Sequence, residues 1–247
     1  APITRAEVLK NIRQLPNHTA SGEDGIPNEL IKNGGDVLVD ALWSFFQHCQ
    51  SNKWSPSEWN TELLKLIHKK GKKNNLDNYR GIYLTSKIGR LYARILNTRL
   101  LEEAEKQGWL PESQAGFRWG RNTSDNLFIL SSLLDDAISR RSNLRLAFVD
   151  IRKAYDSVDR RKLWQRLHEV GVSESFIQVL QSLYCDIQRR VIWKGYKSPP
   201  FLASKGVRQG CPLSPILFAL FVAHIPNKLD ESCTGVPLIE SKVTNLF

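Results

Sequence analysis

The residues of this chain with the clearest chemical potential follow a short apolar run that ends at Val149. Asp150 comes directly after that run, the aromatic Tyr155 follows five positions later, and Asp156 comes next. A carboxylate held at the end of a strand is a natural ligand for a divalent metal in phosphoryl transfer. A ring just past the strand could lie under a nucleotide sugar, where it would clash with a 2′-hydroxyl. The spacing therefore indicates metal-dependent chemistry on nucleotides as one candidate.

Each of these residues also has an ordinary interpretation. Asp150 could cap the next turn or pair with the basic residues that follow it, because an ionised carboxylate beside apolar residues needs a partner. Tyr155 could be a core tyrosine. We expect Asp156 and Asp159 to be structural, as a helix N-cap and a surface charge. The pattern around Asp150 alone does not decide between these alternatives.

A second candidate site is the segment 206–215, which reads GVRQGCPLSP. Glycines on both sides of Gln209 would let the backbone approach a ligand closely. The prolines that follow would begin a helix whose N-terminus favours an anion. The alternative is an ordinary turn before a helix. We do not expect Cys211 to act as a nucleophile, because no histidine is placed locally to activate it.

Two stretches rich in basic residues are candidates for binding phosphates. One is the basic loop between two expected strands, with the sequences IHKKGKK at 67–73 and NYR at 78–80. It carries Lys69 and Arg80 and could close over a triphosphate. A solvated basic loop is the alternative. In the stretch 114–123, Arg118 and Arg121 alternate with aromatic residues and glycines. That composition suits a nucleic-acid backbone with stacked bases.

Composition points to a polyanionic partner. Lys and Arg number 35 against 25 Asp and Glu, so the net charge is +10, and the isoelectric point is near 9.5. Nucleic acid is the first candidate and an anionic membrane the second, although many basic proteins bind nothing specific. No apolar run is long enough for a transmembrane helix, and no signal peptide is recognisable at the N-terminus. We therefore expect no transmembrane segment, and we expect nucleic acid and no membrane as the partner.

The four cysteines are far apart, so neither a zinc site nor a secreted disulfide framework is expected. A reducing intracellular compartment, nucleus or cytoplasm, is the simplest interpretation. Methionine is absent even at position 1, which favours a fragment or processed chain.

Hydrophobic periodicity and turn residues predict the elements that must hold these candidates, and together they indicate an α+β fold. The stretch 124–140 illustrates the helical pattern, since its leucines recur at helical spacing and predict a core stripe. Helices are expected at 5–14, 36–50, 86–106, 124–140, 160–170, 173–184 and 212–225. Strands are expected at 62–68, 80–85 and 144–151, in a hairpin over 187–206 around Gly195, and at 243–247.

The order of the blocks is more specific than any block alone. SGEDGIP at 21–27, NYRGI at 78–82 and QAGFR at 114–118 precede the Asp150 segment and GVRQGCPLSP. In this order the chain resembles the reverse transcriptase of non-LTR (LINE-type) retrotransposons and, more distantly, that of mobile group II introns. The resemblance covers nearly the whole chain, and its last two blocks are highly specific.

The resemblance implies a catalytic role for the first of these candidates. Asp150 corresponds to the first metal-binding catalytic aspartate, and the carbonyl of Ile151 would join the metal shell. Tyr155 corresponds to the residue that selects deoxynucleotides. The implied reaction is phosphoryl transfer with two Mg²⁺ ions, in which a DNA primer is extended with deoxynucleoside triphosphates on an RNA template.

The resemblance also implies roles for the basic and glycine-rich blocks. Lys69 and Arg80 correspond to residues that grip the incoming triphosphate. Gln209 and Gly210 correspond to the loop that lies along the nucleotide and template. The block that contains Arg118 and Arg121 would border the template.

The implied architecture is a right-hand polymerase. Its fingers would span 1–143, with the 187–206 hairpin at the border, and 144–247 would form part of the palm. In the family, a further pair of catalytic aspartates follows on a later strand, which 243–247 would approach. The chain would then hold one of three expected metal-binding carboxylates, so we expect it to be inactive, or nearly so, by itself.

Two other functions stay open at this point. The first is a domesticated or decayed relative that binds nucleic acid without catalysis. The second is an unrelated metal-dependent phosphotransferase or nuclease, which would need a carboxylate cluster elsewhere. Glu102, Glu103 and Glu105 form the densest acidic group, but they are expected on the exposed part of a helix.

Overall fold

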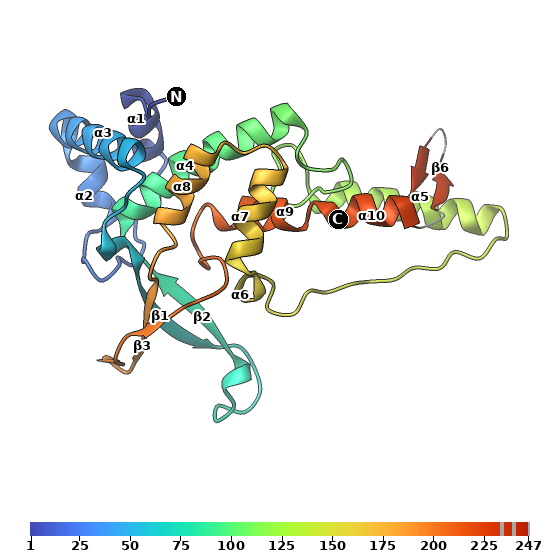
Figure 1. The fold of residues 1–247 in the computed structure, drawn as a ribbon. Helices are drawn as coiled ribbons and strands as arrows, with labels where there is room; N and C mark the ends of the chain where they lie inside the picture. The colour runs from blue at the N-terminus through green and yellow to red at the C-terminus, as the bar shows by residue number, and fades with distance from the viewer. Residues whose placement is uncertain (233–234, 239–240, 247) are drawn as a thin grey trace.

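The computed structural model of the chain describes residues 1–232, 235–238 and 241–246. Helices from both halves of the sequence form one body, and a small sheet extends from it (Figure 1). Helix α5 (Thr123–Ser139) lies at one side of this body, and a long extended segment returns from α5 to the body (Figure 1). The mixture of helices and sheet confirms the predicted α+β class at this coarse level, while the division into fingers and palm stays a prediction.

The helices and strands fall close to the predicted ranges in most of the chain. The other helices are α1 Arg5–Arg13, α2 Asn28–Asn33, α3 Gly35–Asn52, α4 Lys87–Gln107, α6 Ala154–Ser157, α7 Arg160–Glu169, α8 Glu174–Ser182, α9 Ser214–Val222 and α10 His224–Ser232, with 3-10 turns η1 Ser57–Asn60 and η2 Leu76–Asn78. The strands are β1 Thr61–His68, β2 Tyr79–Leu84, β3 Gln188–Trp193, β4 Tyr196–Lys197, β5 Phe201–Leu202, β6 Val236–Leu238 and β7 Ser241–Val243. None of the described helices combines the length and apolar character needed to cross a bilayer.

Helix α4 organises the core. The side chain of Ser86 caps its N-terminus by accepting a hydrogen bond from the Gly89 N–H, and Gly108 ends it in the left-handed conformation with φ 66°. Leu91 and Leu96 are fully buried. One continuous apolar cluster joins α4 to α1, α3, α7, α8 and α9, so segments that are distant in sequence share one core.

The larger sheet has the strand order β2-β1-β3-β4, with β5 paired to β3. Strand β1 runs antiparallel to β2 and parallel to β3. Side chains alternate between the two faces of a strand, and directly paired residues share a face. The register pairs Glu62 with Arg189, and Ile67 with Arg80. Glu62 and Arg189 therefore lie on one face of the sheet, and Arg80 lies on the other.

The predicted strand at 144–151 is wrong for this structure. Residues 142–151 run as an extended segment without a strand partner in the described part of the chain. Phe148 and Val149 are 85% and 89% exposed. An apolar run becomes a strand only where another backbone satisfies its N–H and C=O groups, and the described residues supply none here.

The predicted core stripe of α5 is also largely wrong. Leu133 is the buried residue of this helix, whereas Leu127 and Leu134 are 57% and 40% exposed. The helix itself forms, and the side chain of Asn122 caps its N-terminus. Because α5 extends away from the main body (Figure 1), its apolar positions meet few described neighbours.

The chain beyond the Gln209 loop differs from prediction in two details. The expected helix over 212–225 is divided into α9 and α10. Of the expected strand at 243–247, only Val243 is in a strand, where it ends β7. Residues 244–246 have no strand structure, and Phe247 lies outside the described residues.

Candidate functional site

The structure places the glycine-rich loop against the helix that carries Tyr155. The Val207 N–H donates to the Tyr155 carbonyl, and the Gly206 N–H donates to the Val158 carbonyl, both at 2.8 Å. Gly206 has φ +86°, and a Cβ built on it would lie 2.9 Å from the Tyr155 carbonyl oxygen. Both the conformation and the close approach explain why glycine occupies this position.

Gln209 is joined to the acidic segment by its side chain. Its Nε2 donates to Oδ2 of Asp156 at 2.9 Å. The other carboxylate oxygen of Asp156, Oδ1, is buried and has no hydrogen-bond partner among the described residues. Asp156 is therefore part of the candidate site, a role that its expected helix-cap function did not suggest. The N-cap of α7 is instead Asp159, which accepts from the N–H of Arg161 at 2.9 Å.

Tyr155 is half-buried next to this pair. Its ring lies 5.5 Å from the ring of Phe218 on α9, and burial raises the pKa of Tyr155. The ring packs against the core, as the core-tyrosine interpretation expects, while the backbone carbonyl of Tyr155 contacts the glycine-rich loop; its role in sugar selection stays a prediction. Tyr155 and Gln209 are predicted site residues that the structure brings together, and Asp156, which was not predicted for the site, joins them.

Asp150 and Ile151 are not part of this assembled group. Asp150 is exposed on the extended segment and has no hydrogen bond or ion pair within the described residues, and Ile151 is 40% exposed. No group of three or more His, Cys, Asp or Glu side chains in the described ranges could hold a metal ion. The described residues therefore do not fit a complete Mg²⁺ site, and Asp150 is the one predicted ligand side chain that they offer.

Lys69 and Arg80 lie on the β1–β2 hairpin, away from the Gln209 loop. Both are exposed, and the Lys69 N–H closes the hairpin by donating to the Asn78 carbonyl at 2.8 Å. Arg80 lies on the face of Ile67, whereas the Gln209 loop contacts the opposite face. The structure does not bring these two cations together with Gln209, and their triphosphate role stays a prediction.

Arg118 and Arg121 have partners within the chain. The side chain of Arg118 is 9% exposed, and it donates to the Glu105 carboxylate at 2.7 Å and to the Pro111 carbonyl at 3.0 Å. The hydrogen bond that Arg118 donates to the Glu105 carboxylate is the main cause that raises the pKa of Arg118. Arg121 pairs with Glu112. These arginines fasten the loop after α4, and their contact with a template stays a prediction.

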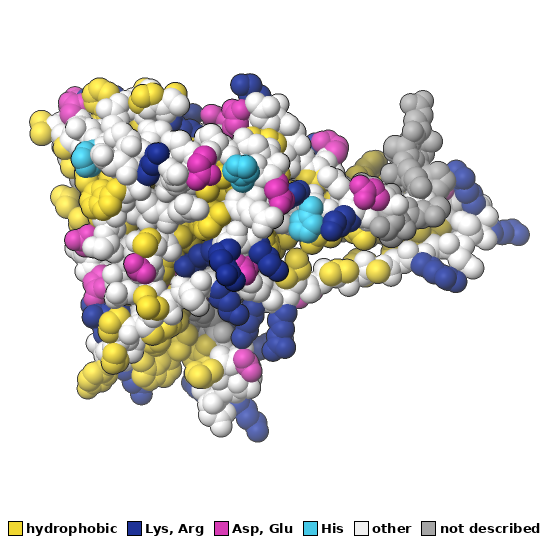
Figure 2. Space-filling model, in the orientation of Figure 1, with side chains coloured by type: hydrophobic (Ala, Val, Ile, Leu, Met, Phe, Trp, Pro, Cys, Tyr) yellow, Lys and Arg dark blue, Asp and Glu magenta, His cyan; other side chains and the backbone are white. Residues whose placement is uncertain are grey.

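The sheet presents a row of aromatic side chains that the sequence did not single out. The rings of His68 and Tyr79 lie 5.2 Å apart, and those of Tyr79 and Trp193 lie 6.0 Å apart. Trp193 is 49% exposed, and the neighbouring Tyr196 is 81% exposed. Figure 2 shows Lys and Arg side chains around the lower part of the molecule, where the sheet lies, with hydrophobic side chains among them. Such a surface suits bases that stack and a backbone that carries negative charge.

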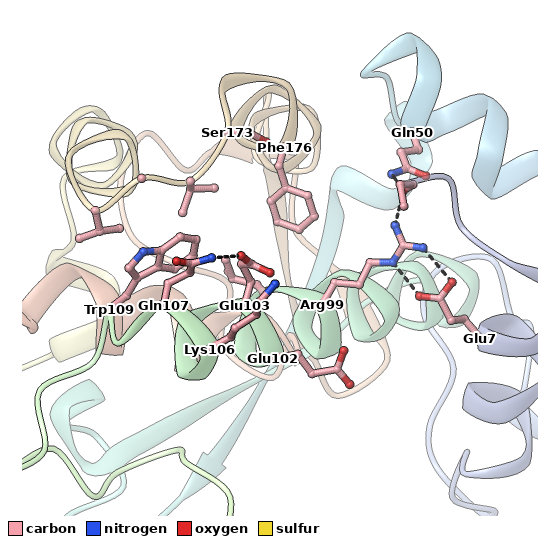
Figure 3. Close-up of a pocket in the computed structure, with 15 residues that line it drawn as sticks. Glu7, Gln50, Arg99, Glu102, Glu103, Lys106, Gln107, Trp109, Ser173 and Phe176 are labelled. Carbon is pink, nitrogen blue, oxygen red and sulfur yellow. Dashed lines mark hydrogen bonds and ion pairs between the residues drawn. The ribbon is translucent and has the colours of Figure 1, made fainter.

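A separate cavity of about 850 Å³ lies beside α4 (Figure 3). Its lining includes Arg99, Glu103 and Phe176, and none of the predicted site residues. Burial alone would raise the pKa of Glu7 here, but the Arg99 guanidinium and the Thr4 N–H outweigh burial and lower this pKa to about 2. Glu103 accepts a hydrogen bond from Gln107 at 2.6 Å (Figure 3). Glu103 and Glu105 of α4 therefore have local partners, and no group of three or more acids in the described ranges could hold a metal ion, which gives no support to an unrelated metal-dependent phosphotransferase.

The family follows from comparison with known proteins. Residues 67–245 match the family described as reverse transcriptase (RNA-dependent DNA polymerase). The chain belongs to the reverse transcriptase family. This range contains the Asp150 segment, Tyr155 and the Gln209 loop, so the predicted resemblance is confirmed at the level of the family.

Relatives of this reverse transcriptase domain come from mobile elements. The chain is 26% identical over 226 residues to the probable RNA-directed DNA polymerase from transposon BS of Drosophila melanogaster, covering 91% of the chain and 25% of the relative. It is 28% identical over 225 residues to the RNA-directed DNA polymerase from mobile element jockey of Drosophila melanogaster, covering 91% and 24%. It is 29% identical over 218 residues to the Pol polyprotein from type-1 retrotransposable element R2 of Popillia japonica, covering 88% and 29%. The chain thus spans about a quarter of the length of these relatives.

Proposed function

We propose that this chain is part of an RNA-directed DNA polymerase of the retrotransposon type. The protein that contains it would add deoxynucleotides to a DNA primer 3′-hydroxyl on an RNA template. The observation that carries this proposal is the meeting of Tyr155, Asp156 and the Gln209 loop inside the region that matches the family.

The geometry supports a nucleotide site next to Tyr155. A half-buried ring can exclude a ribose 2′-hydroxyl by occupying its place, and burial against Phe218 gives this ring a fixed position. Gln209 is oriented by Asp156, and Gly210 has φ +81° with its backbone exposed. The loop can therefore offer backbone and amide groups to a base-paired nucleotide without reading its sequence.

The charge of the chain supports a nucleic-acid partner. A net charge of +10 favours binding to phosphates, and such binding weakens as salt rises. The aromatic row of the sheet adds surfaces on which unpaired bases can stack. RNA template and DNA primer are thus the partners that we propose.

Reverse transcriptases generally use Mg²⁺, and its ligands would be carboxylates. Since Asp150 is the one predicted carboxylate ligand among the described residues, further carboxylates must come from elsewhere for the reaction to proceed. We therefore expect the 247-residue chain alone to incorporate no deoxynucleotide, or very little.

Primer extension on an RNA template with Mg²⁺ tests this function. The protein assayed is a longer polymerase that contains this chain, compared with its Asp150→Ala variant. We expect deoxynucleotide incorporation by the unchanged protein and a loss of about a thousandfold or more in the variant, because a metal contributes several kcal/mol of transition-state stabilisation. Asp159→Ala is the matched control. It removes an aspartate of the same segment that caps α7, and it should retain incorporation.

A non-catalytic nucleic-acid-binding relative is the second candidate function. The observation that favours it is the exposed position of Asp150, outside any group of three or more potential metal ligands in the described part of the chain. Failure of the longer protein to incorporate deoxynucleotides, with salt-sensitive RNA binding retained, would support this candidate and contradict the polymerase.

A further inference from the structure

A buried carboxylate lies on strand β1 of the larger sheet. Glu62 on β1 is fully buried, and its two oxygens accept hydrogen bonds from two different guanidinium groups. Oε1 accepts from Nε of Arg208 at 2.7 Å, and Oε2 accepts from Nε of Arg189 at 2.8 Å. The side chains of these arginines are 6% and 11% exposed. A buried ion is costly unless it is paired in this way, so the three side chains must stay together.

Arg208 carries this network into the glycine-rich loop. Its remaining nitrogens donate to two backbone carbonyls, that of Leu183 at 3.1 Å and that of Trp59. Its own carbonyl accepts a hydrogen bond from the hydroxyl of Ser214. The residue directly before Gln209 is therefore fixed through both its side chain and its backbone.

The same network reaches the strand that borders the loop on its other side. The Arg189 guanidinium lies 4.6 Å from the centre of the Tyr83 ring on β2. A Cβ built on Gly210 would lie 3.8 Å from the Tyr83 carbonyl oxygen, so the loop runs alongside this strand. Gln209 is thus held between Arg208 on one side and Gly210 beside β2 on the other.

We propose that Glu62 is a positioning residue for the nucleotide site, acting through Arg208 to fix the Gln209 loop. Because it is fully buried, Glu62 cannot touch a substrate itself. Its carboxylate fixes the position of the Arg208 side chain, and Arg208 in turn fixes the position of Gln209 and Gly210, which follow it in the chain. The contact of Gln209 with the nucleotide rests on the proposed function, whereas the control of the loop by Glu62 does not.

The first test uses the thiol of Cys211, three residues after Arg208. Cys211 is half-buried, and burial raises the pKa of its thiol, so it should react slowly with iodoacetamide. Glu62→Gln keeps the shape of the side chain but leaves two buried guanidinium groups without a counter-charge. We expect alkylation of Cys211, measured by peptide mass spectrometry, to become about tenfold faster in this variant.

Two internal references separate a displaced loop from an unfolded chain. Cys49 is buried in the core, and its alkylation should stay unchanged. Glu7→Gln makes the same chemical change in the Arg99 ion pair, at the cavity of Figure 3, and it should leave Cys211 protected. Unchanged alkylation of Cys211 in Glu62→Gln would overturn the proposal. Should Cys49 also become reactive, Glu62→Asp decides the matter. Its shorter side chain cannot reach both arginines, and selective alkylation of Cys211 must then appear.

The second test measures single-nucleotide incorporation by a longer polymerase that contains this chain. Glu62→Gln and Arg208→Lys should each raise the KM for the deoxynucleotide about tenfold with a smaller change in kcat, while Glu7→Gln should not. Arg208→Lys keeps the charge but loses the fork that reaches two carbonyls. Faster Cys211 alkylation with an unchanged KM would still support the role of Glu62 in fixing the position of the loop. That result would contradict the nucleotide role of Gln209, which belongs to the proposed function.

Discussion

At the scale of single residues, one short segment contains side chains with opposite surroundings. Tyr155 and Asp156 pack against the Gln209 loop and α9, whereas Asp150 stands exposed on the extended chain. The difference follows from what each residue can reach. Tyr155 and Asp156 find partners inside the described core, and Asp150 finds none among the described residues.

The position of Tyr155 leads to a prediction about sugar selection. In a longer polymerase that contains this chain, Tyr155→Ala should lower discrimination against ribonucleotides by about tenfold or more, because the ring that would meet the 2′-hydroxyl is gone. A factor of ten corresponds to about 1.4 kcal/mol. The measurement is the ratio of kcat/KM for a deoxynucleotide to that for its ribonucleotide.

Tyr155→Phe is the control for this experiment. It keeps the ring on Phe218 and removes only the hydroxyl, so it should retain the discrimination. Equal discrimination in the Ala and Phe variants would show that the ring does not select the sugar.

Single residues also mark how far the sequence could predict the site. Gly206 and Gln209 were predicted because glycine spacing is visible locally, and the structure places Gly206 beside Tyr155 and Gln209 beside Asp156. The contacts of Asp156 with Gln209 and of Glu62 with Arg208 span 53 and 146 residues. Such pairs depend on the register of strands and the packing of helices, which no local pattern encodes.

At the scale of elements, local signals predicted the helices and strands that carry their own hydrogen bonds or find a near neighbour. Helix α4 and the β1–β2 hairpin fall within two residues of their expected ranges. The segment 144–151 and the apolar stripe of α5 failed for a shared reason. Both patterns describe surfaces that another element must cover, and the described residues do not cover them.

The sheet provides a prediction about RNA binding. Trp193→Ala should weaken the binding of single-stranded RNA by this chain by about 1 to 3 kcal/mol, because one stacking surface is lost. Trp54→Ala is a closely matched control. Trp54 is 47% exposed against 49% for Trp193, but it follows α3 and lies outside the sheet. Fluorescence anisotropy with a labelled oligonucleotide at fixed salt measures both variants.

The comparison of the two tryptophans distinguishes a stacking platform from general attraction to a basic protein. Equal affinities for Trp193→Ala, Trp54→Ala and the unchanged chain would assign RNA binding to charge alone. A loss confined to Trp193→Ala would assign part of it to the aromatic row.

At the scale of the whole molecule, net charge and exposed apolar surface have opposite effects on the association of one copy of the chain with another. A net charge of +10 opposes association between copies. Against this, α5 exposes Phe128 and Ile138 at 73% and 74%, and the adjoining extended segment exposes Phe148 at 85%. The same segment has backbone groups without a strand partner in the described part of the chain. Raising the salt concentration screens the repulsion and leaves the apolar attraction in place.

We therefore predict that the 247-residue chain self-associates, and does so more strongly as salt rises. Sedimentation velocity at low and high salt measures this directly. Phe128→Glu should reduce association, since it places a charge within the exposed face of α5. Val37→Glu makes a comparable change at a residue that is 84% exposed on α3, and it should have little effect. A monodisperse monomer at high salt would mean that the exposed face of α5 and the segment 142–151 do not drive association, and that charge alone sets the solution behaviour of the chain.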